Sequence, residues 1–86
     1  MTIKAEITRT FEDKGALLAS AAVIFDDCFI VKNLRVIEGR NGLFVAMPNF
    51  KGKDGRFIDS CFPLNNETRT EIQQAVLEAY DSAGNE

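Results

Sequence analysis

Basic side chains interleaved with aromatic ones form the segment of this chain whose residue types suggest a specific chemistry. Residues 49–57 read NFKGKDGRF, in which Lys51, Lys53 and Arg56 lie beside Phe50 and Phe57. Lysine and arginine bind phosphate groups, and an aromatic ring can stack on a nucleic-acid base. The pattern favours a nucleic-acid-binding loop. The alternative is an ordinary solvated loop whose two phenylalanines anchor it to the core.

The distribution of charge favours a local site over a generally basic protein. The 86 residues carry a formal net charge of −3, which argues against a general nucleic-acid coat. Residues 30–56 nevertheless carry +4, whereas residues 1–29 carry −2 and residues 57–86 carry −5. We expect phosphate binding in the basic segment, at Lys51, Lys53 and Arg56.

Residue types that support catalysis or metal binding are scarce. The chain has no histidine, which excludes Ser-His and Cys-His nucleophile pairs, and no glycine-rich phosphate loop. Cys28 and Cys61 lie in separate apolar runs and cannot complete a tetrahedral zinc site within one chain. We expect a protein that is not an enzyme, with no metal, cofactor or small-molecule substrate. Without a long apolar stretch or a signal segment, we also expect a cytoplasmic location and no membrane contact.

Four runs of residues have the composition of strands: 3–9, 16–25, 28–37 and 43–47. The first alternates apolar and polar residues, which predicts one solvated face, whereas the second is nearly continuously apolar, which predicts cover on both faces. Turns are predicted at residues 12–15 and at Asp26-Asp27. In the third run the apolar parity changes near Lys32-Asn33, as a β-bulge would cause. Pro48 ends the fourth run. Residues 49–55 are predicted to form either a long flexible loop or a loose hairpin tip, and residues 56–62 are an alternative fifth strand.

A tight hairpin is predicted at Asn41-Gly42, because both residues tolerate a positive φ and β-prone runs flank them. Beyond Pro63 the apolar period changes to 3.6, which predicts an amphipathic helix over residues 65–83. Thr68 and Glu71 have capping-box spacing, and Asn65 or Asn66 are alternative N-caps. The sequence therefore predicts one α+β domain over residues 1–86: an antiparallel β-meander of four to five strands, then one C-terminal helix.

The stretch RVIEGRNGLFVAMP at residues 35–48 is more specific than a hairpin requires. It resembles the hallmark of the SpoVG family of bacterial septation regulators, and the likeness extends over about residues 16–80, including the Asp54-Gly55 step and the Thr68-Arg69 pair. The chain departs from the family pattern in several places: Gly52 separates Lys51 from Lys53, no proline precedes Asp54-Gly55, and Phe62 replaces a common histidine.

The resemblance implies a homodimer that associates through strand contacts and binds DNA, RNA or both to regulate septation, sporulation and transcription. It assigns binding to the basic loop and the helix start, here Lys51, Lys53, Arg56, Thr68 and Arg69. Dimerisation is also expected on physical grounds, since one helix covers only part of a four-stranded sheet and leaves apolar sheet surface or a strand edge unpaired. The competing hypothesis is a dimeric adaptor whose basic loop docks an acidic partner protein.

Overall fold

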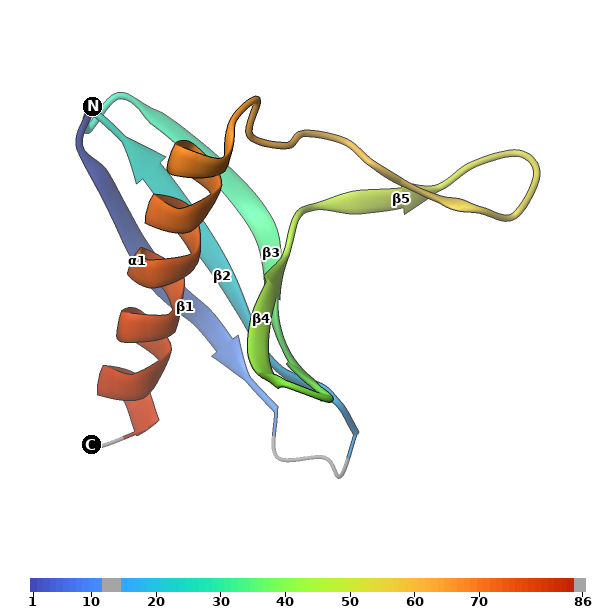
Figure 1. The fold of residues 1–86 in the computed structure, drawn as a ribbon, viewed down its shortest axis with the longest axis horizontal. Coiled ribbons are helices and arrows are strands. Elements are labelled where there is room, and N and C mark those ends of the chain that lie inside the picture. The colour runs from blue at the N-terminus through green and yellow to red at the C-terminus, as the bar shows by residue number, and fades with distance from the viewer. Residues whose placement is uncertain (12–14, 85–86) are drawn as a thin grey trace.

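The computed structural model describes residues 1–11 and 15–84. Within them, six strands precede one helix: β1 (Ile3–Thr10), β2 (Leu17–Phe25), β3 (Phe29–Gly39), β4 (Gly42–Ala46), β5 (Asn49–Lys51), β6 (Phe57–Asp59) and α1 (Asn66–Gly84). Strands β1 to β4 form an antiparallel meander in chain order, and α1 lies across one face of it (Figure 1). The predicted α+β class is confirmed. In the described ranges, no helix is long and apolar enough to cross a membrane.

The hydrophobic core lies between the four-stranded sheet and α1. Its buried residues come from β2, β3, β4, the residue that follows β4, and the helix: Ala19, Ala21, Val23, Leu34, Val36, Val45, Met47, Ile72 and Val76. In β2, Ala22 faces away from the helix and is as fully buried as Ala21 and Val23, but Ser20 and Ile24 on the same face are only half-buried. The predicted cover on both faces of this strand is therefore only partial. The helix covers only one face. On the other face Ile30 and Phe44 are each 44% exposed.

Strands β2 and β3 are joined by the predicted turn at Asp26-Asp27. Both residues have a positive φ, 51° and 55°, and Cys28 N–H closes the turn by donating to the Phe25 carbonyl at 3.0 Å. Two contacts with the N-terminal residues, one at Thr2 and one in β1, offset part of the cost of these conformations. The Thr2 N–H donates to Asp26 Oδ1 at 2.7 Å, and Lys4 Nζ lies 2.9 Å from Asp27 Oδ1.

The predicted β-bulge in the third strand is confirmed. Ala21 pairs with Leu34 and Val23 pairs with Val31, so β3 contains one more residue than β2 between these pairs. Asn33 accommodates the extra residue with a φ of 70°, a conformation that asparagine tolerates better than most residues. The bulge keeps Val31, Leu34 and Val36 on the helix side of the sheet. The turn predicted at 12–15 falls largely outside the described residues.

The hairpin between β3 and β4 forms where the sequence predicted it, but with a different conformation. Gly39 pairs with Gly42, so Arg40 and Asn41 occupy the turn. Only Gly42 has a positive φ, 115°, and Asn41 does not. Asn41 does not use its tolerance of a positive φ, because the register places the Asn-Gly step one residue later than a central Asn-Gly pair requires.

Helix α1 begins after Asn65, which resolves the alternatives for its cap. Asn65 Oδ1 accepts a 2.8 Å hydrogen bond from the Thr68 N–H. This is the bond that an N-cap side chain makes with the N–H three residues later in the chain. The Asn65 carbonyl also accepts a bond from Arg69 N–H at 3.2 Å. Thr68 therefore lies inside the first turn and is not the cap.

Candidate nucleic-acid interface

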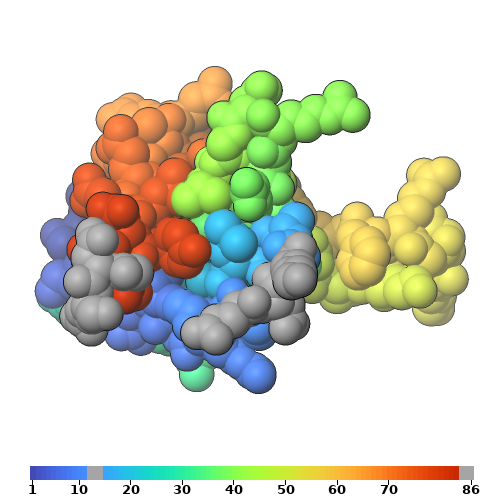
Figure 2. Space-filling model, turned by 90° about the horizontal axis from the view of Figure 1, so that it is seen from below, coloured from blue at the N-terminus to red at the C-terminus, as the bar shows by residue number. Residues whose placement is uncertain are grey.

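The basic segment forms a two-stranded arm, residues 49–59, that stands apart from the body of the protein. Strands β5 and β6 pair with each other, so the alternative fifth strand exists but is shorter than 56–62 and does not join the meander. Neither strand contacts any other described helix or strand. Figures 1 and 2 both show the arm projecting from the body. The sequence predicted a loop or loose hairpin tip here, and the hairpin is what forms.

Hydrogen bonds order the arm at both ends. At its base, the N–H and the hydroxyl of Ser60 both donate to the Pro48 carbonyl, at 2.8 and 3.1 Å. At its tip, Gly52 N–H donates to the Arg56 carbonyl at 2.8 Å, and Gly55 N–H donates to the Gly52 carbonyl at 3.1 Å. Gly55 has a φ of 84°, which glycine adopts without strain. The arm is thus a defined ribbon and not an irregular loop.

The two faces of the arm differ in chemistry because successive side chains of a strand point to opposite faces. Lys51 is directly opposite Phe57, so a cation and an aromatic ring share one face. Phe50 is opposite Ile58 on the other face, which is apolar. Phe57 is 70% exposed, and Phe50 and Ile58 are 53% and 49% exposed. These rings do not anchor the arm to the core, as the solvated-loop alternative supposed.

The cations at the tip are free to meet a polyanion. Lys51, Lys53 and Arg56 are all exposed, and the Arg56 side chain is 87% exposed. Arg56 Nε lies 3.7 Å from Asp54 Oδ2, an ion pair worth at most about 1 kcal/mol at such exposure. Asp54 Oδ1 also accepts a bond from the Arg56 N–H at 3.1 Å, so this carboxylate shapes the turn while lowering its positive charge.

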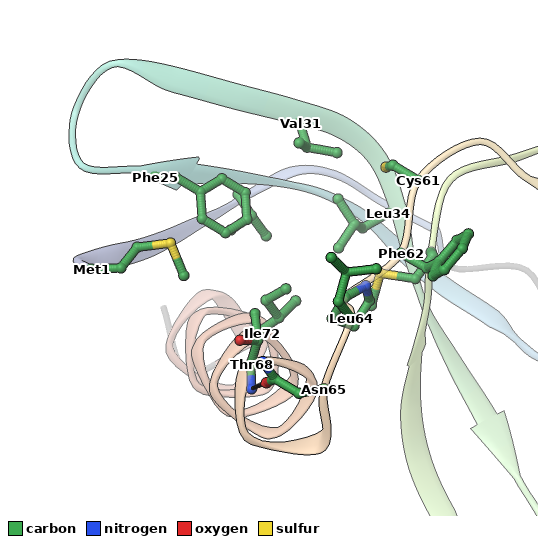
Figure 3. Close-up of a pocket in the computed structure, with 13 residues that line it drawn as sticks. Met1, Phe25, Val31, Leu34, Cys61, Phe62, Leu64, Asn65, Thr68 and Ile72 are labelled. Carbon is green, nitrogen blue, oxygen red and sulfur yellow. Dashed lines mark hydrogen bonds between the residues drawn. The ribbon is translucent and has the colours of Figure 1, made fainter.

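The structure does not bring the two helix-start residues together with the arm. Arg69 is half-buried in the first turns of α1, whereas the arm tip extends away from that helix (Figure 1). Thr68 is half-buried and faces an apolar pocket (Figure 3). Its N–H is already bonded to Asn65, and Glu67 adds an acidic charge to the same turn. Within one chain, the predicted residues thus form two separate groups.

Two features of this region were not found from the sequence. One is the cross-strand pairing of Lys51 with Phe57, which depends on a register that only the tip geometry fixes. The other is the pocket beside the helix start, to which Cys61 and Phe62 contribute. The signal available in the sequence was Leu64, an apolar residue directly before the helix cap and outside every predicted strand or helix. In the structure it is 92% exposed. In the described ranges, no cluster of three or more His, Cys, Asp or Glu could hold a metal ion.

The fold is a small α+β domain with a four-stranded meander, one covering helix and a projecting arm that carries basic residues. Comparison with known proteins identifies its family. The model of the SpoVG family matches residues 1–82, so the chain belongs to the SpoVG family. The family resemblance drawn from the sequence is thereby confirmed.

Individual relatives have the same family name. The chain is 45% identical over 74 residues to a protein of Caldicellulosiruptor bescii named "Putative septation protein SpoVG", covering 86% of this chain and 84% of the relative. It is 46% identical over 78 residues to "Putative septation protein SpoVG 2" of Listeria monocytogenes, covering 91% and 76%. A Clostridium perfringens protein with the first of these names is 44% identical over 77 residues, covering 90% and 86%.

Proposed function

We propose that this chain is a non-catalytic, sequence-specific DNA-binding regulatory protein that also accepts RNA, and that it acts in the cytoplasm on genes of septation and sporulation. The septation part of this proposal is supported by the names of its relatives. The nucleic-acid part is supported by the arm. A projecting ribbon with cations at its tip suits a groove or a single strand, both of which are lined by phosphates.

The single observation that carries the proposal is the pairing of Lys51 with Phe57 on one exposed face of the arm. A lysine binds a phosphate as a point charge, and a ring beside it can stack on the adjoining base. Lys53 and Arg56 add two more exposed cations in the turn at the tip of the arm. A loop whose charges merely keep it soluble has no need to hold an aromatic ring in water next to them.

We propose further that the protein is a homodimer that associates through strand contacts. The support is the amount of apolar surface that one chain leaves in water, on the open sheet face and on both strands of the arm. Monomeric proteins of this size rarely expose so many large apolar side chains together. A dimer also doubles the number of arms that can engage one nucleic acid.

Direct binding tests the proposal. Gel-shift or filter-binding measurements at low salt, with unrelated DNA and RNA, should show affinity in the micromolar range or tighter. Replacing Lys51, Lys53 and Arg56 together by alanine should abolish it. The matched control replaces Glu78 and Asp81, which are exposed on α1, and should bind equally or slightly better. Absence of binding by the parent at low salt would reject the nucleic-acid proposal.

The apolar face of the arm favours a second candidate function, a dimeric adaptor for another protein. Phe50 and Ile58 are both about half exposed and lie directly opposite each other on that face. If the parent protein binds no nucleic acid at low salt, the adaptor function becomes the preferred one. Binding that survives loss of the three arm cations would argue against the arm as the nucleic-acid site.

A further inference from the structure

The hairpin of β3 and β4 carries a surface that the arm does not use. Its sequence, RVIEGRNGLFVAMP, is more specific than a hairpin requires. Arg35, Ile37 and Phe44 alternate with core residues of the same strands, so they point to the open face of the sheet, away from α1. Together with Arg40, which lies in the turn, these residues form what we call the β3–β4 patch.

The aromatic ring of this patch has a defined place on the sheet. A Cβ added to Gly39 would come within 3.0 Å of Phe44 Cε1 and 3.1 Å of Phe44 Cδ1, so only glycine leaves room for the ring there. Gly39 does not have a positive φ, and its contribution is therefore space and not an unusual backbone conformation. Phe44 nevertheless remains 44% exposed. The ring is thus positioned by the strand below it while its outer side stays open to a ligand.

Two guanidinium groups accompany the ring. Phe44 pairs with Ile37, two residues along β3 from Arg35, so Phe44 and Arg35 are diagonal neighbours on one face. Long side chains reach each other across such a diagonal. Arg40 is exposed in the turn at the end of the hairpin. Among the described residues, neither arginine is in an ion pair.

The charge on the two sides of the sheet differs in sign. Glu38, the only acid in β3 and β4, alternates with Ile37 and so points to the helix side. Glu6 is on the open face, but on β1 at the opposite edge of the sheet. The outer surface of α1 is acidic, with four exposed carboxylates: Glu67, Glu71, Glu78 and Asp81. An anionic ligand is therefore attracted to the β3–β4 patch and repelled from the helix.

We propose that the β3–β4 patch is a second contact for single-stranded nucleic acid, in which a base stacks on Phe44 while Arg35 and Arg40 hold neighbouring phosphates. The inference rests on the proposed function for the class of ligand and goes beyond it by placing a contact on the body of the protein. Aromatic rings on the open face of a four-stranded antiparallel sheet stack bases of single strands in other proteins. In a duplex the bases are stacked on one another, so the patch selects single strands.

Other occupants fit the patch less well. Two copies of the patch meeting across a two-fold axis would bring arginines together with no carboxylate between them. A small apolar ligand would leave both guanidinium groups unused, and an acidic protein segment would leave the ring unused. A single strand uses the ring and both cations. With one ring and two cations, the patch adds to the affinity of the arm and does not replace it.

Matched probes test the patch. A fluorescent oligothymidylate and its duplex with oligoadenylate are titrated with the full chain at low salt. Phe44→Ala should weaken binding of the single strand about 5- to 150-fold and leave binding of the duplex unchanged. Phe44→Tyr keeps a ring and should bind both probes like the parent. The control is Phe29→Ala, because Phe29 is a 64% exposed ring that pairs with Phe25 on the helix side of the same sheet. It should change neither affinity.

Two further measurements locate the contact. Gly39→Ala removes no ring and no charge, but its Cβ displaces the Phe44 ring, so single-strand affinity should fall by less than in Phe44→Ala while duplex affinity stays the same. Circular dichroism checks that each variant is folded. Photocrosslinking to a bromouracil-substituted single strand, followed by trypsin digestion and tandem mass spectrometry, should place a crosslink on Phe44. Crosslinks on Phe57 alone would overturn the proposal.

The patch and the arm can fail separately. If Phe44→Ala binds the single strand as tightly as the parent, or loses equal affinity for the duplex, stacking at the patch is refuted and the arm is unaffected. If replacing Lys51, Lys53 and Arg56 by alanine costs nothing and Phe44→Ala still weakens single-strand binding, the patch is supported and the arm assignment fails. A parent that binds neither probe at low salt refutes both.

Discussion

The salt dependence of binding should report how many arm cations meet phosphate. Each arm offers Lys51, Lys53 and Arg56, and two arms of a dimer offer six cations. Neutralising about six phosphates of duplex DNA gives a slope of log K against log salt concentration near −5. Between 50 and 200 mM salt, the affinity of the parent should then fall about 10³-fold. The ion pair of Arg56 with Asp54 shifts this estimate little, because both side chains are largely exposed.

Single substitutions make the count of arms measurable. Lys51→Ala removes one cation per chain, so the slope should become less steep by about 2 if both arms bind and by about 1 if only one does. Fluorescence anisotropy with one labelled duplex at four or five salt concentrations resolves this difference. The Glu78→Ala and Asp81→Ala control should keep the parent slope, since the exposed face of α1 that carries these two residues is placed outside the contact. A slope that Lys51→Ala leaves unchanged would refute the assignment of this lysine to phosphate.

Three further predictions concern single residues. Gly42→Val should lower the free energy of unfolding by about 1–3 kcal/mol, because a φ of 115° is strained for valine even though an added Cβ meets nothing within 4 Å. Thermal melting measures this loss. The control is Gly15→Ala, where an added Cβ also meets nothing, and it should leave the melting temperature nearly unchanged. Asn65→Ala should lower the free energy of unfolding by about 1 kcal/mol and the melting temperature by several degrees, whereas the neighbouring Asn66→Ala should change neither. If the two variants melt at the same temperature, Asn65 is not the N-cap. Phe57→Ala should weaken single-strand binding by about 1–3 kcal/mol in a titration, and Phe57→Trp should restore it if stacking is the cause.

The main sheet and the helix could be predicted from the sequence because each is long enough to show its period. Alternation in residues 3–9 predicted β1, and the change of parity near Asn33 located the bulge that the register confirms. Burial of one face is strong enough to fix these registers, since a slip of one residue would turn every apolar side chain outward. The helix was predicted to within one residue at each end.

The arm could be predicted only in part, because its strands are three residues each and have no buried face. Nothing in such short runs shows a period, so the sequence left a loop, a hairpin tip and a fifth strand as alternatives. The pairing of Lys51 with Phe57 follows from the number of residues in the tip, which composition does not reveal. The pocket was missed for a different reason: its walls come from strands, linker and helix that are distant in the chain.

The register of the arm also determines whether one ribbon can perform both proposed tasks. Phe50 and Lys51 are adjacent in the chain and point to opposite faces, so protein contact and phosphate contact do not compete for the same surface. The hydrogen bonds of Gly52 and Gly55 fix this register at the tip. A slip of one residue would place Phe57 opposite Phe50 and leave Lys51 opposite an arginine. The tip glycines therefore matter for the separation of the two faces as well as for the turn itself.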